Sequence, residues 1–461
     1  MLSKQDNEML IKTGPETPMG RLLRRYWTPA CLSSEIAEPD SPPLRVRLLG
    51  EDLVAFRDTE GRVGLIDENC PHRGTSLFFG RNEESGLRCV YHGWKFDVAG
   101  NCVDMPSEPG AAFKDKLKLL SYPTHESGGV IWTYMGPPEK NAGFRDFGTE
   151  NLPREKWRAG YFVQPMNWMQ AMEGTIDTTH PSWLHAWKGA ALIEDDGSDT
   201  PGAYNSGKMQ WRFWAHDKAP RVELVDTWHG WRAAGLRNTP NGNTHARLYQ
   251  YTFPYTAGPG GGAWVVPVDD TQTRLFFMVT EETELKASMV VGGYLGLDFE
   301  GWPYDEDGKV RNKENDWLID REAQKDGTIY TGIGGMFNNQ DIMATQTAFS
   351  DRTKEHLGTL DRKIIRMRRL LLDAAKNLEQ GIDPPCTDPS LPYSKIGTPD
   401  KVLMANEDWT VLGSEEDPFK NKLREEFART AAERADVKPE KLVMMPGTGV
   451  MANYLRPGAR R

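Results

Sequence analysis

The sequence predicts an α+β protein in which a small antiparallel β domain precedes a larger domain with an antiparallel sheet flanked by helices. Three observations predict this class. The chain has 461 residues, more than one ordinary domain. Its 45 glycines and 31 prolines indicate many turns. Short runs rich in β-branched and aromatic residues recur in both halves, whereas clear helical periodicity is confined to a few segments.

The first part of the chain predicts the small β domain. Residues 12–32 indicate a turn, a short helix and an extended exit. Six short β-rich runs with regular spacing then follow, as expected for a domain of about 100 residues. The runs are 45–49, 52–56, 63–67, 87–92, 95–100 and 128–136. The stretch GPPEKNAGF at 136–144 is interpreted as a linker, and we expect the first domain to span residues 1–150.

The second part begins near Gly160 and predicts a helix over 167–180. Strands are expected at 209–216, 221–231, 245–253, 263–269 and 273–280. The glycine cluster 258–262 lacks the ending of a phosphate-binding loop, so it is interpreted as a turn. Apolar residues at helical spacing predict an amphipathic helix over 360–380, and Gly381 is suited to end it. Its basic cluster Arg366, Arg368 and Arg369 is expected on a solvated face and not in a binding patch.

The remainder of the chain is expected to be peripheral. Residues 382–400 are proline-rich and extended, and the charged segment 414–437 predicts a helix at the surface. We therefore expect a catalytic domain over 151–400. An extension over 401–461 would pack on that domain or on a neighbouring subunit.

Composition excludes several classes of protein. The 66 acidic and 56 basic residues give a net charge of −10, which argues against a nucleic-acid binder that relies on phosphate contacts. No run of 18 apolar residues predicts a membrane span, and the charged start MLSKQDNEML does not resemble a signal peptide. Five scattered cysteines do not make a disulfide scaffold. A cytoplasmic location is expected.

The first group of candidate ligands combines two cysteines with two histidines. Cys70-x-His72 is followed by Cys89-x-x-His92, and each pair lies in a glycine-bearing loop next to β-rich runs. Zinc is the first alternative, but zinc fingers pair cysteine with cysteine and histidine with histidine, usually beside a helix. Here each loop offers one thiolate and one imidazole. Two such loops meeting at their tips would give the ligand sorting of a Rieske [2Fe–2S] centre.

These residues also carry a specific resemblance. The segments CPHRG and CVYHGWKFD are similar to the signature of the Rieske domain of bacterial ring-hydroxylating oxygenases. The resemblance implies that Cys70, His72, Cys89 and His92 hold a Rieske [2Fe–2S] cluster in the domain over 1–150. It also implies a helix-grip or START-like catalytic domain.

A second group lies in the segment NWMQAMEGTIDTTHPSWLH. Glu173, Asp177 and His180 are spaced four and three apart, so a helix would place them on one face, and His185 follows after a short turn. A lone histidine is more often a core residue, but two histidines beside carboxylates favour a metal site. The segment resembles the mononuclear-iron motif E-x-x-x-D-x-x-H-x-x-x-x-H of the same oxygenases.

By that resemblance His180 and His185 would be iron ligands. Asp177 would be the acid between the cluster of one subunit and the iron of its neighbour, and Glu173 and Asn167 would lie in the same catalytic region. The 2-His-1-carboxylate triad needs one more carboxylate. Asp341 is the single charged residue of the amide- and glycine-rich run 327–350, so we assign it as the third ligand; the alternative is an ordinary helix N-cap.

Three further segments resemble the phthalate dioxygenase group, which also contains aromatic O-demethylases. They are TPMGRLLRRYW, SLFFGRNEESGLRC and DRTKEHLGTLDRKIIRMRRLLLDAA. The resemblance implies a terminal oxygenase that uses dioxygen and has no β subunit. A reductase with flavin and a plant-type [2Fe–2S] cluster would supply electrons from NAD(P)H. Head-to-tail packing of subunits would give a homotrimer or a stacked hexamer.

The substrate is expected to be an aromatic small molecule, and arginines are the residues that would bind a carboxylate on it. Five arginines lie on predicted strands, and a guanidinium group binds a carboxylate in bidentate fashion. Arg247, within HARLYQYTF, is the preferred candidate for an aromatic carboxylate. Phthalate-like dihydroxylation is the first hypothesis. O- or N-dealkylation by the same metals, a non-catalytic electron carrier and a structural zinc protein are the alternatives.

Overall fold

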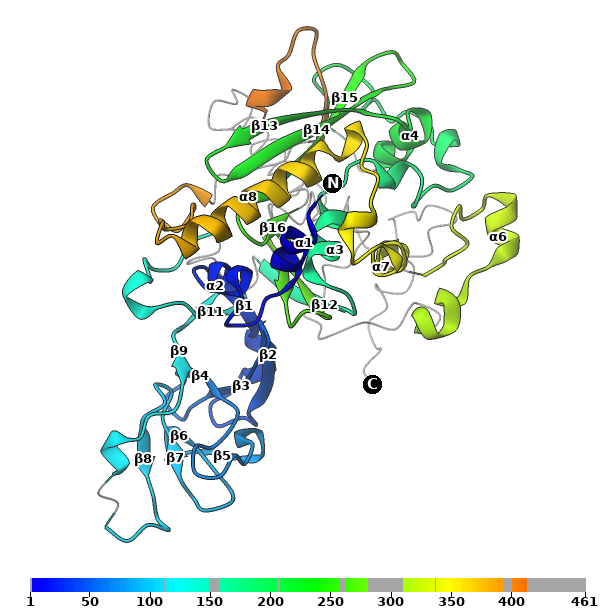
Figure 1. The fold of residues 1–461 in the computed structure, drawn as a ribbon. Helices are drawn as coiled ribbons and strands as arrows, with labels where there is room; N and C mark the ends of the chain where they lie inside the picture. Colours follow the sequence, from blue (N-terminus) through cyan, green and yellow to red (C-terminus); the bar gives the residue numbers. More distant parts are fainter. Residues whose placement is uncertain are drawn as a thin grey trace, which may run out of the picture.

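A computed structural model describes most of the chain between residues 2 and 412. The residues outside the description are 1, 111–112, 149–156, 205–207, 258–262, 281–309, 336, 394–395, 397–399 and 413–461. The turn expected at 258–262 and the helix expected at 414–437 therefore lie outside the described residues. The α+β class is confirmed, and Figure 1 shows a small β domain that projects from a larger domain of sheet and helices.

The small domain contains two four-stranded antiparallel sheets. One sheet has the order β2-β3-β4-β9 and the other β5-β6-β7-β8. The strands of the first are Leu44–Leu48, Glu51–Arg57, Val63–Asp67 and Ser121–Tyr122, and those of the second are Arg81–Glu83, Gly86–Arg88, Lys95–Phe96 and Cys102–Asp104. The second sheet lies at the end of the domain that is remote from the large domain (Figure 1).

A three-stranded sheet joins the small domain to the large one. In it β1 (Trp27–Leu32) and β10 (Thr124–Ser127) flank β11 (Val130–Tyr134). Trp132 of β11 packs edge-on against Trp264 of the large sheet, with ring centroids 5.5 Å apart. These indoles are almost fully buried, and they are part of one hydrophobic core that extends through both regions.

The large domain is built on an eight-stranded antiparallel sheet of order β12-β18-β17-β16-β15-β14-β13, with β19 paired to β15. The strands are Trp157–Gln164, Thr273–Thr280, Ala263–Pro267, Thr256–Ala257, Thr244–Thr252, Gly230–Asn238, Arg221–Thr227 and Asp400–Val402. Because β19 adds to this sheet, the start of the expected C-terminal extension packs on the large domain. The boundaries at 150 and 400 stay predictions.

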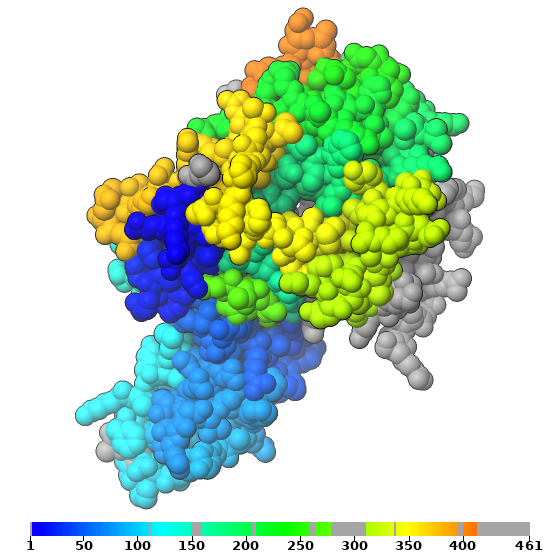
Figure 2. Space-filling view, turned by 45° about the vertical axis from the view of Figure 1, so that its right-hand side comes forward, coloured from blue at the N-terminus to red at the C-terminus, as the bar shows by residue number. Residues whose placement is uncertain are grey.

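Helices cover the sheet, and the longest is α8 (Arg362–Glu379), which ends just before Gly381 as expected. The others are α1 (Lys4–Ile11), α2 (Pro18–Leu23), α3 (Trp168–Thr175), α4 (Lys208–His216), α6 (Arg321–Asp326) and α7 (Phe337–Thr347). Figure 2 shows the N-terminal segment packed beside α8. No described helix is both long and apolar enough to cross a membrane.

Two predicted elements were wrong. Residues 209–216, expected as a strand, form helix α4, because the buried residues Met209, Gln210, Phe213 and Trp214 follow the helical spacing and not an alternation. The helix expected over 167–180 ends at Thr175.

The early end of α3 has a local cause. The Asp177 side chain accepts hydrogen bonds from the backbone N–H groups of Thr179 and His180, at 3.0 and 3.1 Å. Such a turn competes with the helical hydrogen-bond pattern. A short 3₁₀ turn, His180–Ser182, follows. The predicted helix face shared by Glu173, Asp177 and His180 therefore does not form.

Candidate metal centres

The two Cys–His loops of the small domain have the same backbone design. Each cysteine carbonyl accepts a hydrogen bond from the N–H of the glycine four residues later, Gly74 for Cys70 (2.8 Å) and Gly93 for Cys89 (3.0 Å). Both glycines have positive φ, +77° and +79°, a conformation that side chains with a Cβ rarely adopt. The sequence therefore closes each loop tightly and turns its cysteine and histidine towards the other loop.

The two cysteines and the two histidines differ in exposure. The thiols of Cys70 and Cys89 are buried, whereas His72 is exposed and His92 half-buried. The two imidazole rings lie against each other, with centroids 4.4 Å apart. Burial, with a contribution from the neighbouring Cys89, raises the pKa of the Cys70 thiol to about 11. A bound metal is therefore needed to hold the Cys70 sulfur as a thiolate at neutral pH.

The residues fit a two-metal cluster better than one zinc ion. Nδ1 of His92 is buried and has no hydrogen-bond partner within the described structure, as expected for a nitrogen kept free for a metal. Both thiols are free of disulfides. Among the described residues, the group of three or more ligand atoms close enough to share one ion lies in the large domain. A pair of thiols and a pair of imidazoles spread over a wider space is what the two irons of a Rieske centre require.

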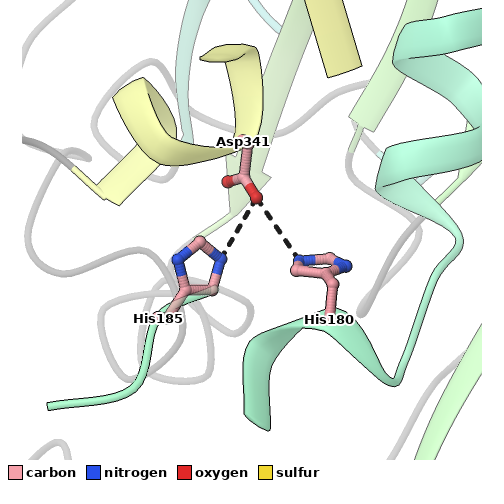
Figure 3. A group of neighbouring side chains, drawn as sticks. All are labelled: His180, His185 and Asp341. Carbon is pink, nitrogen blue, oxygen red and sulfur yellow. Dashed lines mark ion pairs between the residues drawn. The ribbon is translucent and has the colours of Figure 1, made fainter. Parts of the chain in front are cut away.

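The second centre joins His180, His185 and Asp341 (Figure 3). Nε2 of His180 lies 3.3 Å and Nε2 of His185 3.1 Å from the same carboxylate oxygen of Asp341, Oδ1. The histidines come from the 3₁₀ turn after α3 and the residues just beyond it, and Asp341 comes from α7. Two imidazoles and one carboxylate on adjacent sides of a site leave other positions open, which is the arrangement that suits non-heme ferrous iron.

Partners on the far side of each ring set its orientation. Gln340 donates through Nε2 to the carbonyl of Ile333 (2.9 Å), so its Oε1 is the acceptor for Nδ1–H of His185, also at 2.9 Å. Nδ1 of His180 lies 3.4 Å from Oδ2 of Asp177. Both Nε2 atoms therefore point to Asp341 with their lone pairs available for a metal.

Charges around the site keep the carboxylates ionised. Although burial opposes it, the pKa of Asp177 is held well below its usual range by His180 and by the ammonium group of Lys363, 2.9 Å away. Burial would lower the pKa of His180, but Asp177 and Asp341 raise it to about 9. Without a metal, the imidazole therefore takes up a proton between two carboxylates, as expected for a place suited to a cation.

Two predicted catalytic residues lie elsewhere. Glu173 accepts hydrogen bonds from Arg352 and Arg368, at 2.9 and 2.8 Å, and so ties α3 to α8. Asn167 is the N-cap of α3: its Oδ1 accepts from the N–H of Met169, and its Nδ2 donates to the carbonyls of Ile11 and Asp270. Within the described structure neither side chain forms a hydrogen bond or ion pair with His180, His185 or Asp341, and a catalytic role for them stays a prediction.

Sequence reasoning missed Gln340 and Lys363. Gln340 directly precedes Asp341 in the amide-rich run, and only the fold shows that its amide faces His185. Lys363 had a detectable signal. It shares a helix face with the apolar residues Met367 and Leu371, at spacings of four, and a charged residue on such a face calls for a buried partner. Of the basic cluster expected on a solvated face, Arg369 is exposed and Arg366 half-buried, but Arg368 is buried, which corrects the expectation for that residue.

Two buried arginines face the same side of the large sheet. Arg247 pairs with Gly235 in the register of β15 and β14, and Arg237 lies two residues further along β14, so both side chains are on one face. Arg237 donates through Nη2 to the carbonyl of Thr178 (2.7 Å), next to the iron-ligand loop. Nε and Nη1 of both arginines lack a partner within the described structure.

Arg247 is also held by aromatic rings. Its guanidinium carbon lies 4.5 Å from the ring centre of Trp214 and 5.0 Å from that of Tyr249. Burial raises the pKa of Tyr249, and the two guanidinium groups oppose the rise. Because Arg237 reaches the carbonyl of Thr178, two residues before His180, the arginine face lies beside the segment that carries the two histidines.

Comparison with known proteins agrees with this geometry. Residues 26–123 match the Rieske [2Fe-2S] domain family, and residues 133–430 match the family described as LigXa C-terminal domain like. The chain belongs to the Rieske oxygenase family, in its phthalate dioxygenase-like group. A Rieske [2Fe–2S] cluster and a mononuclear iron that works with dioxygen are the cofactors of these enzymes.

Curated relatives cover most of the chain. It is 40% identical over 423 residues to the phthalate 4,5-dioxygenase oxygenase subunit of Pseudomonas putida, with 87% of this chain and 90% of the relative covered. It is 36% identical to the 3-chlorobenzoate-3,4-dioxygenase oxygenase subunit of Comamonas testosteroni (85% and 93% covered). It is 30% identical to the 5,5'-dehydrodivanillate O-demethylase oxygenase subunit of Sphingobium sp. strain NBRC 103272 / SYK-6 (83% of each).

Solved structures confirm the fold. Dicamba monooxygenase bound to dicamba gives a TM-score of 0.51 at 17% identity, with 78% of this chain and 99% of that chain covered. The terminal oxygenase of carbazole 1,9a-dioxygenase from Nocardioides aromaticivorans IC177 gives 0.50 at 18% identity, with 81% and 97% covered. Both are Rieske oxygenases, so the arrangement of a small β domain and a large domain of sheet and helices is that of the family.

Replacing Cys89 by serine should remove the cluster, because a hydroxyl group is a poor substitute for a thiolate ligand. The visible absorption of the purified protein and the EPR signal after dithionite reduction should both disappear. Cys102→Ser is the matched control, since Cys102 is a buried free thiol in the same hydrophobic cluster. A folded Cys102→Ser protein without the cluster would show that the wrong thiols have been assigned.

Replacing Gln340 by leucine should weaken metal binding about 10–100-fold, the usual cost of removing a group that orients a ligand. The ring of His185 would lose the acceptor that fixes its proton on Nδ1. Titration of metal-depleted protein with Co²⁺ measures the dissociation constant. Gln346→Leu on the same helix is the control, because Gln346 contacts the carbonyl of Pro165 instead. Equal affinities for the two variants would contradict the role of Gln340.

Proposed function

We propose that Cys70, His72, Cys89 and His92 hold the Rieske cluster of this oxygenase and that His180, His185 and Asp341 hold its iron. The convergence of two imidazole Nε2 atoms on one carboxylate oxygen carries this proposal. When bound, the cluster supplies single electrons and the iron supplies open positions for dioxygen. The protein residues orient these groups: Gln340 and Asp177 hold the two imidazoles from behind.

We infer that Asp177 works between two copies of the chain. Figure 1 shows the β5–β8 end of the small domain far from α3 and α7, so a second chain would have to bring its cluster to this site. Exposed apolar groups suit such a contact at both places. Val90 and Tyr91 are exposed beside the cluster loops, and Trp183 is exposed between the two histidine ligands. A head-to-tail homotrimer, or two trimers stacked as a hexamer, follows from this arrangement.

The substrate we propose is an aromatic carboxylate, with Arg247 as the group that binds its carboxylate and Arg237 as a second candidate. Both side chains are buried, carry unpartnered N–H groups and lie on the sheet face next to the metal site. A buried guanidinium without an anion is costly, and a bidentate carboxylate would compensate for it. Two relatives have aromatic carboxylates in their names, phthalate and 3-chlorobenzoate, which supports dihydroxylation of such a ring.

O-demethylation or another monooxygenation is the second candidate. It is favoured by the relative whose name is an O-demethylase oxygenase subunit. The same ligands and the same arginines would serve both reactions, and the position of the substrate relative to the iron would decide between them. A non-catalytic electron carrier would not need the His180, His185 and Asp341 group, so we do not favour that function.

Electrons are proposed to come from a separate reductase that carries flavin and a plant-type [2Fe–2S] cluster and is fed by NAD(P)H. The relatives are named as oxygenase subunits, which supports a system of several components. We expect no β subunit. A cytoplasmic location is proposed because all five cysteines are free.

Replacing His180 by alanine should abolish product formation and leave the Rieske EPR signal unchanged. The experiment supplies a surrogate reductase and NADH and screens phthalates, halobenzoates and methoxybenzoates for products. Metal analysis should fall from about three irons per chain to about two, since two belong to the cluster. Turnover that survived this substitution with folded protein would show that the iron lies elsewhere.

Replacing Arg247 by glutamine should lower kcat/KM for a carboxylate substrate about 10–100-fold, because a charge-assisted hydrogen bond contributes about 1.5–3 kcal/mol. The effect should be carried by KM. Arg221→Gln is the control, since Arg221 is exposed at the start of β13. Steady-state rates with an acid and its methyl ester test the assignment: the variant should lose its preference for the acid, and an unchanged preference would contradict the role.

A further inference from the structure

A buried lysine reaches the acid next to the iron ligands. Lys363 is the second residue of α8, and its side chain is 1% exposed. Its ammonium group lies 2.9 Å from Oδ1 of Asp177 and donates to the carbonyl of Leu360 at 3.0 Å. At the other histidine, the neutral amide of Gln340 accepts from Nδ1–H of His185 through its Oε1.

Local physics disfavours a lysine at this position. Burial removes the ammonium group from water, and the first turn of a helix carries a partial positive charge that repels a cation. Met367 and Leu371, one and two turns along the same face, are fully buried and apolar, so an apolar residue would suit helix and core better. The carboxylate of Asp177 is the charge that compensates for both costs.

The carboxylate of Asp177 divides its contacts between its two oxygens. Oδ1 accepts from Lys363 and from the N–H of Thr179, at 2.9 and 3.0 Å. Oδ2 accepts from the N–H of His180 at 3.1 Å and lies 3.4 Å from Nδ1 of the same residue. Because Lys363 holds the first oxygen, the second stays in the position that orients the imidazole.

A second ion pair joins the same two elements. Arg368, five residues after Lys363 on α8, lies 2.8 Å from Glu173, four residues before Asp177. Arg368 also pairs with Glu355 at 2.6 Å, and Glu173 with Arg352. Helix α8 therefore contacts the end of α3 through this network. Through Lys363 it contacts the loop that follows α3. The network fixes the helix, and Lys363 is the contact that reaches the ligand loop.

We propose that Lys363 is a positioning residue for the iron site. It acts through Asp177, whose carboxylate it holds so that Nε2 of His180 is directed to the metal and Asp177 itself stays in place for the approach of the neighbouring chain. This inference rests on the function proposed above. It differs from a purely stabilising ion pair because it predicts a change at the metal when only α8 is altered.

The test compares metal-depleted variants by Co²⁺ titration, using the affinity and the visible spectrum of the bound ion. Lys363→Met should weaken binding about tenfold and alter the spectrum. Lys363→Arg should recover most of the affinity. Lys376→Met is the matched control. Lys376 lies on the same helix as Lys363, but its side chain is half-exposed and pairs with Asp6 of α1. It should bind Co²⁺ within about twofold of the unaltered protein.

A double substitution keeps the test decisive if Lys363→Met fails to fold. Asp177→Asn with Lys363→Met removes both charges and leaves no unpaired buried ion. If Lys363 acts only through Asp177, adding Lys363→Met to Asp177→Asn should change neither the Co²⁺ affinity nor the spectrum further. A further tenfold loss in the double variant would overturn the proposal.

Other outcomes separate the two proposals. If Lys363→Met lowers the thermal midpoint yet binds Co²⁺ with unchanged affinity and spectrum, the ion pair is only stabilising and the inference is wrong. If the unaltered protein and His180→Ala bind Co²⁺ equally, the assigned iron site is wrong and the proposed function fails with it. Rapid-mixing measurement of cluster oxidation adds an independent readout, in which Lys363→Met should be slower than Lys376→Met.

Discussion

Two imidazoles and a carboxylate that meet at one oxygen atom are the constraint on which the large domain depends. Gathering three metal-binding side chains at one point costs conformational freedom, so each side chain needs neighbours that hold it in place. Gln340 holds His185, Asp177 holds His180, and α7 carries Asp341 to them. Helix α8 supports these contacts, because its Lys363 pairs with Asp177 and its Arg368 pairs with Glu173. Several charges of the large domain thus lie close to one site.

In the small domain, backbone geometry has the larger part in placing the candidate ligands. Its ligands lie on two loops whose shape is set by backbone hydrogen bonds and by Gly74 and Gly93. The thiols are in the core and the imidazoles are near the surface. Electron exchange with another protein needs one edge of the cluster close to the outside, and this sorting places the imidazole edge there. In this domain, backbone geometry and graded exposure arrange the candidate ligands.

Residue spacing made the candidate ligands predictable because each motif is local. Cys70 with His72, Cys89 with His92, and His180 with His185 are close in sequence, and the turn-forming residues between them belong to the same segments. Asp341 was found because a single charge stands out in an apolar and amide-rich run. The amphipathic pattern of α8 was strong enough to give its position and its end.

The early end of α3 has a local cause, but the other residues that the sequence left unexplained share one physical reason, which is that their partners come from distant segments. Aromatic residues at 209–216 imitate an alternation, and only packing against the sheet shows a helix. Glu173 could not be assigned without knowing that Arg352 and Arg368 would reach it. Asn167 serves as a helix cap and contacts Ile11 and Asp270, neither of which its own segment reveals.

The packing of α1 against the start of α3 has a consequence for the order of folding. Trp168 donates to the carbonyl of Leu10 and Asn167 to that of Ile11, so residues 158 and 156 positions earlier in the chain complete the start of α3. These contacts close a loop that contains the whole small domain. The start of α3 therefore acquires its final partners only through a long-range contact, whose cost in chain entropy exceeds that of a local turn.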